Sequence, residues 1–120
     1  TPESGAHPEY VLAVLAAGPE STAITDGFAD CPMCATLPRA RVLRSAIAAV
    51  EAVDGETVGG VGDEPLPPRA GMPPHKGVHG MIHAMALYAG SGVEHVTAVR
   101  PAADVVRELA NGAEGLLRVW

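Results

Sequence analysis

The residues best suited to chemistry are two cysteines and two histidines. Cys31 and Cys34 are separated by two residues, and His79 and His83 lie four apart, a spacing that puts two side chains on one face of a helix. Two thiolates and two imidazoles are a ligand set for tetrahedral Zn²⁺, so the pattern predicts a candidate zinc site. Two alternatives stay open. One is a redox-active dithiol, and the other is ordinary loop thiols beside a solvated histidine face.

A glycine-rich loop is the second candidate site. Gly90-Ser91-Gly92 follows the apolar run 84–89, which we expect to be the end of a helix. Glycines permit a close backbone approach and a left-handed conformation, and such a loop can present bare N–H groups to an anion. The competing interpretation is a simple turn.

Length, charge and cysteine content restrict the function classes. The chain has 120 residues, enough for one small domain with a modest core. Its net charge of -6 and the lack of a basic run argue against nucleic acid as a partner. No run approaches the roughly 20 apolar residues of a membrane span. Two cysteines are too few for a secreted disulfide scaffold, so we expect a cytoplasmic protein.

The first half of the chain predicts alternating helices and a strand. Ser4 is a candidate cap for a helix from Pro8 to about Ala17, which Gly18-Pro19 ends. The β-prone residues within 21–28 predict a short strand, and 30–38 a loop. The apolar spacing then predicts a helix from Arg39 to near Val53.

The second half begins with a segment rich in Gly and Pro at about 54–74, in which we expect no regular element. A helix is predicted over 75–88, interrupted by glycines, and a short strand over 96–99. Pro101 then starts a final helix. It either continues to about Leu117 or ends at Ala110, with a strand over 116–120.

Five stretches carry a resemblance to a known family in their order and spacing. They are Thr1–Pro8, Thr25–Phe28, Arg41–Arg44, Ala84–Gly90 and Val99–Leu109. Together they resemble the C-terminal part of nitronate monooxygenases, the 2-nitropropane dioxygenase-like FMN proteins. The similarity runs over most of the chain and is weakest in the central Gly/Pro segment. It favours one continuous final helix from Ala102 to about Leu117.

The resemblance implies an α/β fold class: a small α/β domain and the closing helices of an FMN-binding TIM barrel whose core is missing. We expect residues 1–74 to form the small domain, with the linker at its end, and 75–120 to form the C-terminal helices and the glycine loop. Family members oxidise alkyl nitronates with molecular oxygen. Their catalytic histidine and a phosphate-binding loop lie before the matched region. The chain begins at Thr1 without an initiator Met, so we expect it to be processed or to be a piece of something larger.

The function implied is therefore a C-terminal subunit or fragment of an FMN-dependent oxidoreductase, not active alone. Its expected partner is a flavin-barrel polypeptide or a second copy, and substrate would be reached through that partner. Gly90, Ser91 and Gly92 are the candidate FMN contacts, although the family usually has Gln where this chain has Ser91. The alternative is a non-catalytic zinc-binding or protein-interaction domain. Without the barrel, we expect an apolar stripe on the final helix to be exposed; its residues are Val105, Val106, Leu109, Leu116 and Leu117.

Overall fold

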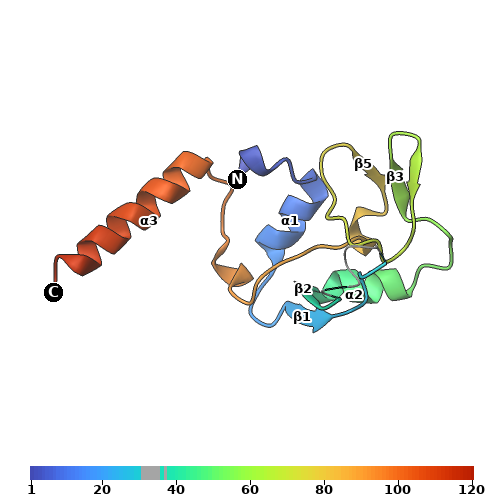
Figure 1. Ribbon diagram of the computed structural model, residues 1–120, viewed down its shortest axis with the longest axis horizontal. Coiled ribbons are helices and arrows are strands. Elements are labelled where there is room, and N and C mark those ends of the chain that lie inside the picture. Colours follow the sequence, from blue (N-terminus) through green and yellow to red (C-terminus); the bar gives the residue numbers. More distant parts are fainter. Residues whose placement is uncertain (31–35, 37) are drawn as a thin grey trace.

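A computed structural model describes residues 1–30, 36 and 38–120 of the chain. These residues form a small mixed α/β domain with two small sheets and three α-helices (Figure 1). The molecule is elongated, with extents of 56 × 27 × 27 Å, because helix α3 (Ala102–Leu117) extends away from everything else. We refer to the part before α3 as the body.

Helix α1 (Pro8–Ala16) confirms the first predicted helix, although its cap is a different residue. His7 is the N-cap, and its Nδ1 accepts a hydrogen bond from the Glu9 N–H at 3.2 Å. Pro8 follows in the first turn, where its missing N–H costs nothing. Ser4 belongs instead to the short 3₁₀ helix η1 (Pro2–Ser4), and its hydroxyl donates to the Thr1 carbonyl. The prediction of Ser4 as the cap was therefore wrong.

The first sheet pairs β1 (Thr22–Thr25) with β2 (Ala40–Leu43) in antiparallel register. Strand β1 confirms the strand predicted within 21–28. The predicted helix start at Arg39 was wrong, because residues 40–43 form a strand and α2 (Arg44–Glu51) begins only after it. The apolar residues of β2 are buried as expected. The spacing of these apolar residues fits a helix as well as a strand. Backbone pairing with β1 makes this segment a strand.

A second sheet lies within and beyond the Gly/Pro-rich segment, in the order β4-β3-β5. Its strands are β3 (Gly59–Val61), β4 (Glu64–Leu66) and β5 (Val78–Gly80). The prediction of no regular element in 54–74 was therefore wrong. Glycine makes the pairing possible, since a Cβ on Gly59 would lie 1.9 Å from the His79 carbonyl oxygen.

The helix predicted over 75–88 is absent, which corrects the expectation of C-terminal helices from residue 75 onward. This stretch forms β5, the 3₁₀ helix η3 (Ile82–Ala84) and then an extended segment beside β2. In that segment the Leu43 N–H donates to the Leu87 carbonyl at 2.9 Å, and the Ala89 N–H donates to the Arg41 carbonyl at 3.2 Å. These long-range bonds override the local helical composition.

The end of the chain confirms the final helix and contains neither the strand predicted over 96–99 nor the alternative strand over 116–120. The 3₁₀ helix η4 (Val93–His95) is followed by an irregular segment, so the strand predicted over 96–99 was wrong. Helix α3 runs without interruption from Ala102 to Leu117, as the family resemblance favoured, and no strand follows it. None of the described helices has both the length and the apolar character needed to cross a bilayer.

Two buried clusters make up the core, and each contains residues from both sides of position 74. The first lies between α1, β2, α2 and the extended segment, and consists of Phe28, Val42, Leu43, Ala46, Val50, Ala86, Leu87 and Val93. The second lies between α2 and the β4-β3-β5 sheet, and consists of Val58, Val78, Ile82, Ala84 and Met85. No residue of α3 is buried, so the core is complete without that helix.

Candidate functional site

The segment that leads into the glycine loop is held on both sides by tyrosine hydroxyls. Tyr10 on α1 donates its hydroxyl to the Tyr88 carbonyl at 2.5 Å, and Tyr88 donates its own hydroxyl to the Gly71 carbonyl at 2.7 Å. Burial raises the pKa of both phenols above the ordinary value of 10.0. Both hydroxyls therefore stay protonated and act as donors at neutral pH, which fixes the start of the loop relative to α1.

The loop itself is open to solvent and its backbone donors are free. Gly90, Ser91 and Gly92 are exposed, whereas Val93 directly after them is buried. The Val93 N–H donates back to the Gly90 carbonyl at 3.2 Å, which closes the turn. Among the residues that the structure describes, the N–H groups of residues 90–92 have no partner. They are the type of donor that binds an anion in a backbone concavity.

The glycines of this loop are not required by the chain's own packing. Neither Gly90 nor Gly92 adopts the left-handed conformation that glycine permits. A Cβ on Gly90 would meet no atom within 4 Å, and one on Gly92 would make only an ordinary contact with His95. Among the described residues, no neighbouring atom therefore requires glycine at position 90 or 92.

The histidines of the zinc hypothesis do not share a helix face, because residues 75–88 do not form the predicted α-helix. His79 lies on β5 with its Nε2 3.0 Å from the Gly62 carbonyl oxygen, while His83 belongs to η3. Cys31 and Cys34 lie outside the described residues. Within the described ranges, no group of three or more His, Cys, Asp or Glu side chains could hold a metal ion. A zinc site that includes the two cysteines stays a prediction.

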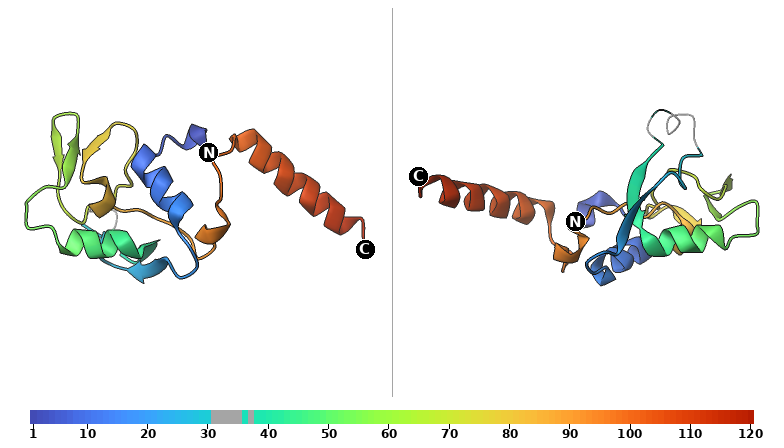
Figure 2. Two further views of the ribbon diagram at one scale, coloured as in Figure 1. Left: turned by 180° about the vertical axis from the view of Figure 1, so that it is seen from behind. Right: turned by 90° about the horizontal axis from the view of Figure 1, so that it is seen from below.

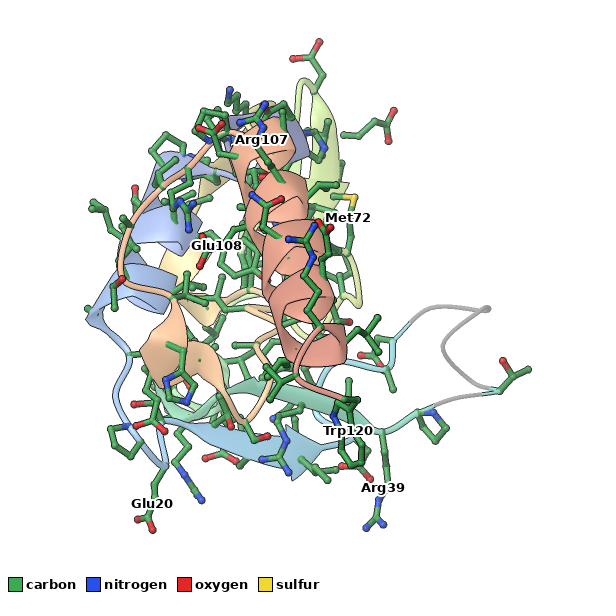
Figure 3. The ribbon with its side chains drawn as sticks, turned by 90° about the vertical axis from the view of Figure 1, so that its left-hand side faces the viewer. Glu20, Arg39, Met72, Arg107, Glu108 and Trp120 are labelled. Carbon is green, nitrogen blue, oxygen red and sulfur yellow. The ribbon has the colours of Figure 1, made fainter. Side chains whose placement is uncertain are left out.

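Helix α3 extends away from the body (Figure 2) and exposes one broad apolar face and one charged face. The apolar face contains Val106, Leu109, Leu116 and Leu117, which are 65–74% exposed, and it continues to Trp120 beyond the helix end. Figure 3 places Trp120 just beyond the free end of α3, far from Arg107 and Glu108 in the first half of the helix. Soluble monomers rarely tolerate an apolar patch of this extent.

The charged residues of α3 pair with one another and with Arg100 just before the helix. Arg107 pairs with Asp104 at 2.8 Å, and two further pairs join Arg100 to Glu108 and Arg118 to Glu114. Exposed pairs of this type contribute little stability each. They leave the apolar face as the side of α3 that is available for a partner.

One side chain of the body holds the start of α3. The Ala102 N–H lies 3.2 Å from both carboxylate oxygens of Glu3. The pKa of Glu3 is lowered first by the hydrogen bond from its own backbone N–H and then by this bond from Ala102. A carboxylate at a helix N-terminus also interacts favourably with the helix dipole. No local pattern indicates this contact, because Glu3 and Ala102 are 99 positions apart in the chain.

An apolar groove lies between α1 and the segment that leads to α3. It has a volume of about 260 Å³. Its apolar lining includes Val11, Val14 and Leu15 from α1, and Val96 and Val99 from the later segment. Of the helical face predicted for α1, Tyr10 and Val14 both pack against the first core cluster and line this groove, whereas Val11 and Leu15 line the groove without belonging to that cluster.

Comparison of the chain with family models, with curated proteins and with solved structures gave no match in any of the three. The function must therefore be argued from the residues and their arrangement.

Proposed function

We propose that this chain is the C-terminal part of an FMN-dependent oxidoreductase of the nitronate monooxygenase type. In this proposal it packs against a flavin-binding barrel on another polypeptide and forms one wall of the flavin and substrate site. It does not catalyse alone, and the small-molecule substrate is reached through the partner. The five stretches that resemble the family are one support for this proposal.

The observation that carries the proposal is the unpartnered apolar face of α3. An α-helix of 16 residues that buries none of them gains little from the body of its own chain. Its apolar positions form a broad stripe, since Val105 and Leu117 lie beside the row made by Val106, Leu109 and Leu116. A stripe of this width is typical of a helix that covers a folded domain, and a narrow seam is typical of a two-stranded coiled coil. We therefore favour a folded barrel over a second α3 as the occupant.

The glycine loop supplies the second argument. Its exposed N–H groups follow directly after the anchored Tyr88, and its Gly90 faces open space. A flavin phosphate held by a partner could approach such a backbone closely, because no Cβ is in the way. Ser91 adds a short hydroxyl in place of the longer Gln side chain that the family usually carries.

The first experiment tests the α3 face. The tagged chain is expressed in its native source, and the assembly that it forms is isolated and weighed. Leu109→Asp should release the partner, because it would bury an unpaired carboxylate in the contact. Asn111→Asp adds the same charge to the opposite, charged face and should leave the assembly intact. Equal behaviour of the two variants would contradict the proposed docking face.

The second experiment tests the loop. Gly90→Ala should leave the stability of this chain unchanged, since nothing lies within 4 Å of the new methyl group. In the assembled protein the same change should weaken FMN binding, measured as flavin released on dilution. Unchanged FMN retention would mean that the loop does not approach the cofactor.

A further inference from the structure

Two exposed apolar surfaces meet where α3 leaves the body. The first is the groove of α1, which a second hollow of about 370 Å³ extends to Leu12, because both hollows share Val11 and Leu15. The second is the apolar face of α3. Val96 lines the groove and also lines a further hollow together with Val105 of α3, so the two surfaces are continuous.

A connector formed by residues 97–101 joins these surfaces. It is exposed and irregular, and among the described residues the backbone N–H and carbonyl groups of 97–100 form no hydrogen bond. A segment without such bonds changes its backbone angles at little cost. An extended connector of this length spans up to about 17 Å, and a helix with its side chains is about 10 Å wide. The connector is therefore long enough to let α3 turn onto the groove.

Glu3 is the side chain that sets the present direction of α3. Among the described residues, its bond to the Ala102 N–H is the only hydrogen bond or ion pair that joins α3 to the chain before the connector. The N-cap residue of α3 is Pro101, which provides no side-chain cap of its own. Because the first N–H groups of a helix point along its axis, turning α3 toward the groove breaks the bond to Glu3.

We propose that α3 is a hinged arm that Glu3 holds open, and that it closes on the groove of its own body when this bond breaks. Closing brings Val106 and Leu109, which are 65% and 68% exposed, against Val11 and Leu15 of the groove. All four side chains are aliphatic, so the contact needs no polar partner. The release of water from both surfaces stabilises the closed arm.

The chain's own α3 is the occupant of the groove because the connector keeps it close. A short tether gives an effective concentration on the order of millimolar, which a second copy reaches only in concentrated solution. Closing covers the apolar face of α3 in the free chain, where this face would otherwise stay exposed. Any partner of α3 then competes with the groove, so the inference does not depend on which protein that partner is.

The test measures this contact in the free full-length chain. The methyl groups of Val and Leu are labelled with ¹³C, and NOEs between methyl groups report which side chains lie close together. A closed arm gives NOEs between Leu109 and the groove residues Val11 and Leu15. The Cα radius of gyration of the open structure is 16.4 Å, and small-angle X-ray scattering should show a chain more compact than this structure.

Three variants separate the parts of the arm. Glu3→Ala removes a carboxylate that contributes about two- to fivefold at a helix N-terminus, so the ratio of closed to open chains should rise by that factor. Val11→Asp places a carboxylate in the groove and should abolish the NOEs, while the body stays folded because Val11 belongs to neither core cluster. Asn111→Asp adds the same charge to the charged face of α3 and should keep the NOEs.

Each contrary result overturns the proposal in a different way. If Glu3→Ala shows no NOE between Leu109 and the groove, the arm does not close, because the closed form should be most populated in this variant. If NOEs survive Val11→Asp, the groove is not where α3 docks. If a mixture of labelled and unlabelled chains shows that the contact runs between chains, a second copy occupies the groove in place of the chain's own α3.

Discussion

The hydroxyl of Tyr10 should contribute measurably to the stability of the body. It reaches from α1 to the Tyr88 carbonyl at 2.5 Å, and it joins residues that are 78 positions apart in the chain. Tyr10→Phe removes this hydroxyl and retains the ring that packs against the first core cluster. The substitution therefore isolates one hydrogen bond, with no cavity created.

The expected magnitude follows from how accessible the two groups are. A hydrogen bond between protein groups contributes about 0.5–1.5 kcal/mol net, and a fully buried orphaned carbonyl raises the loss to about 3 kcal/mol. Tyr10 and Tyr88 are only half-buried, so water can reach the carbonyl after the substitution. We therefore expect the free energy of unfolding to fall by about 1 kcal/mol.

Urea unfolding at pH 7 measures this loss. Val11→Ala on the same helix serves as a control for helix perturbation, because Val11 lines the open groove and does not contact the core clusters. A Tyr10→Phe chain as stable as the wild type would refute the role assigned to this hydroxyl.

The same hydroxyl predicts a dependence on alkaline pH. Burial raises the pKa of Tyr10 in the folded protein, so the folded state holds this proton more tightly than the unfolded state does. Its contribution to the free energy of unfolding is fully present below the ordinary tyrosine pKa of 10.0 and is lost as pH rises through the raised pKa of the folded protein. Tyr10→Phe should remove this part of the alkaline loss and leave the part due to Tyr88, whose pKa is raised as well.

Further predictions concern Gly59, Gly112, Glu3 and the candidate zinc site. Gly59→Ala should destabilise the body by about 2–3 kcal/mol in thermal unfolding, because its Cβ would meet a backbone oxygen. Gly112→Ala should raise the helicity of α3, because no atom blocks the new methyl group and alanine is favoured over glycine in a helix by about 1 kcal/mol. Because the pKa of Glu3 is lowered, the stabilisation of α3 by its carboxylate is present above the ordinary glutamate pKa of 4.5 and is lost as pH falls through the lowered pKa. The ellipticity of α3 should therefore fall in this acid range in the wild type and not in Glu3→Gln. If the zinc hypothesis holds, elemental analysis should find one Zn²⁺ per chain and Cys31→Ser should release it, while metal-free protein with fully reactive thiols would exclude the site.

Local signals predicted the elements that depend on local physics. Pro8 and Gly18 delimit α1, and Pro101 precedes α3, since proline and glycine act through the backbone of their own segment. The apolar spacing also identified buried residues correctly, among them Val42 and Val50. What it could not decide was whether Val42 is buried from a helix or from a strand.

The elements that the sequence missed depend on partners far away in the chain. Strand β2 forms because it pairs with β1 and with the segment around Leu87, and the β3–β5 contact forms because glycines face each other across it. For the candidate site, the sequence identified Gly90-Ser91-Gly92 and the exposed stripe of α3. It missed the two tyrosine bonds, the Glu3 contact and the capping role of His7, because side-chain partners of this kind leave no periodic pattern.

The most direct test of the proposed function is the mass and flavin content of the native assembly that contains this chain. The account predicts a complex with a second, flavin-binding polypeptide, yellow from bound FMN, which dissociates on Leu109→Asp and survives Asn111→Asp. A second copy of the chain as the only partner would place the apolar face in a homodimer and exclude the barrel. A stable, colourless monomer that Leu109→Asp leaves unchanged would contradict the account altogether.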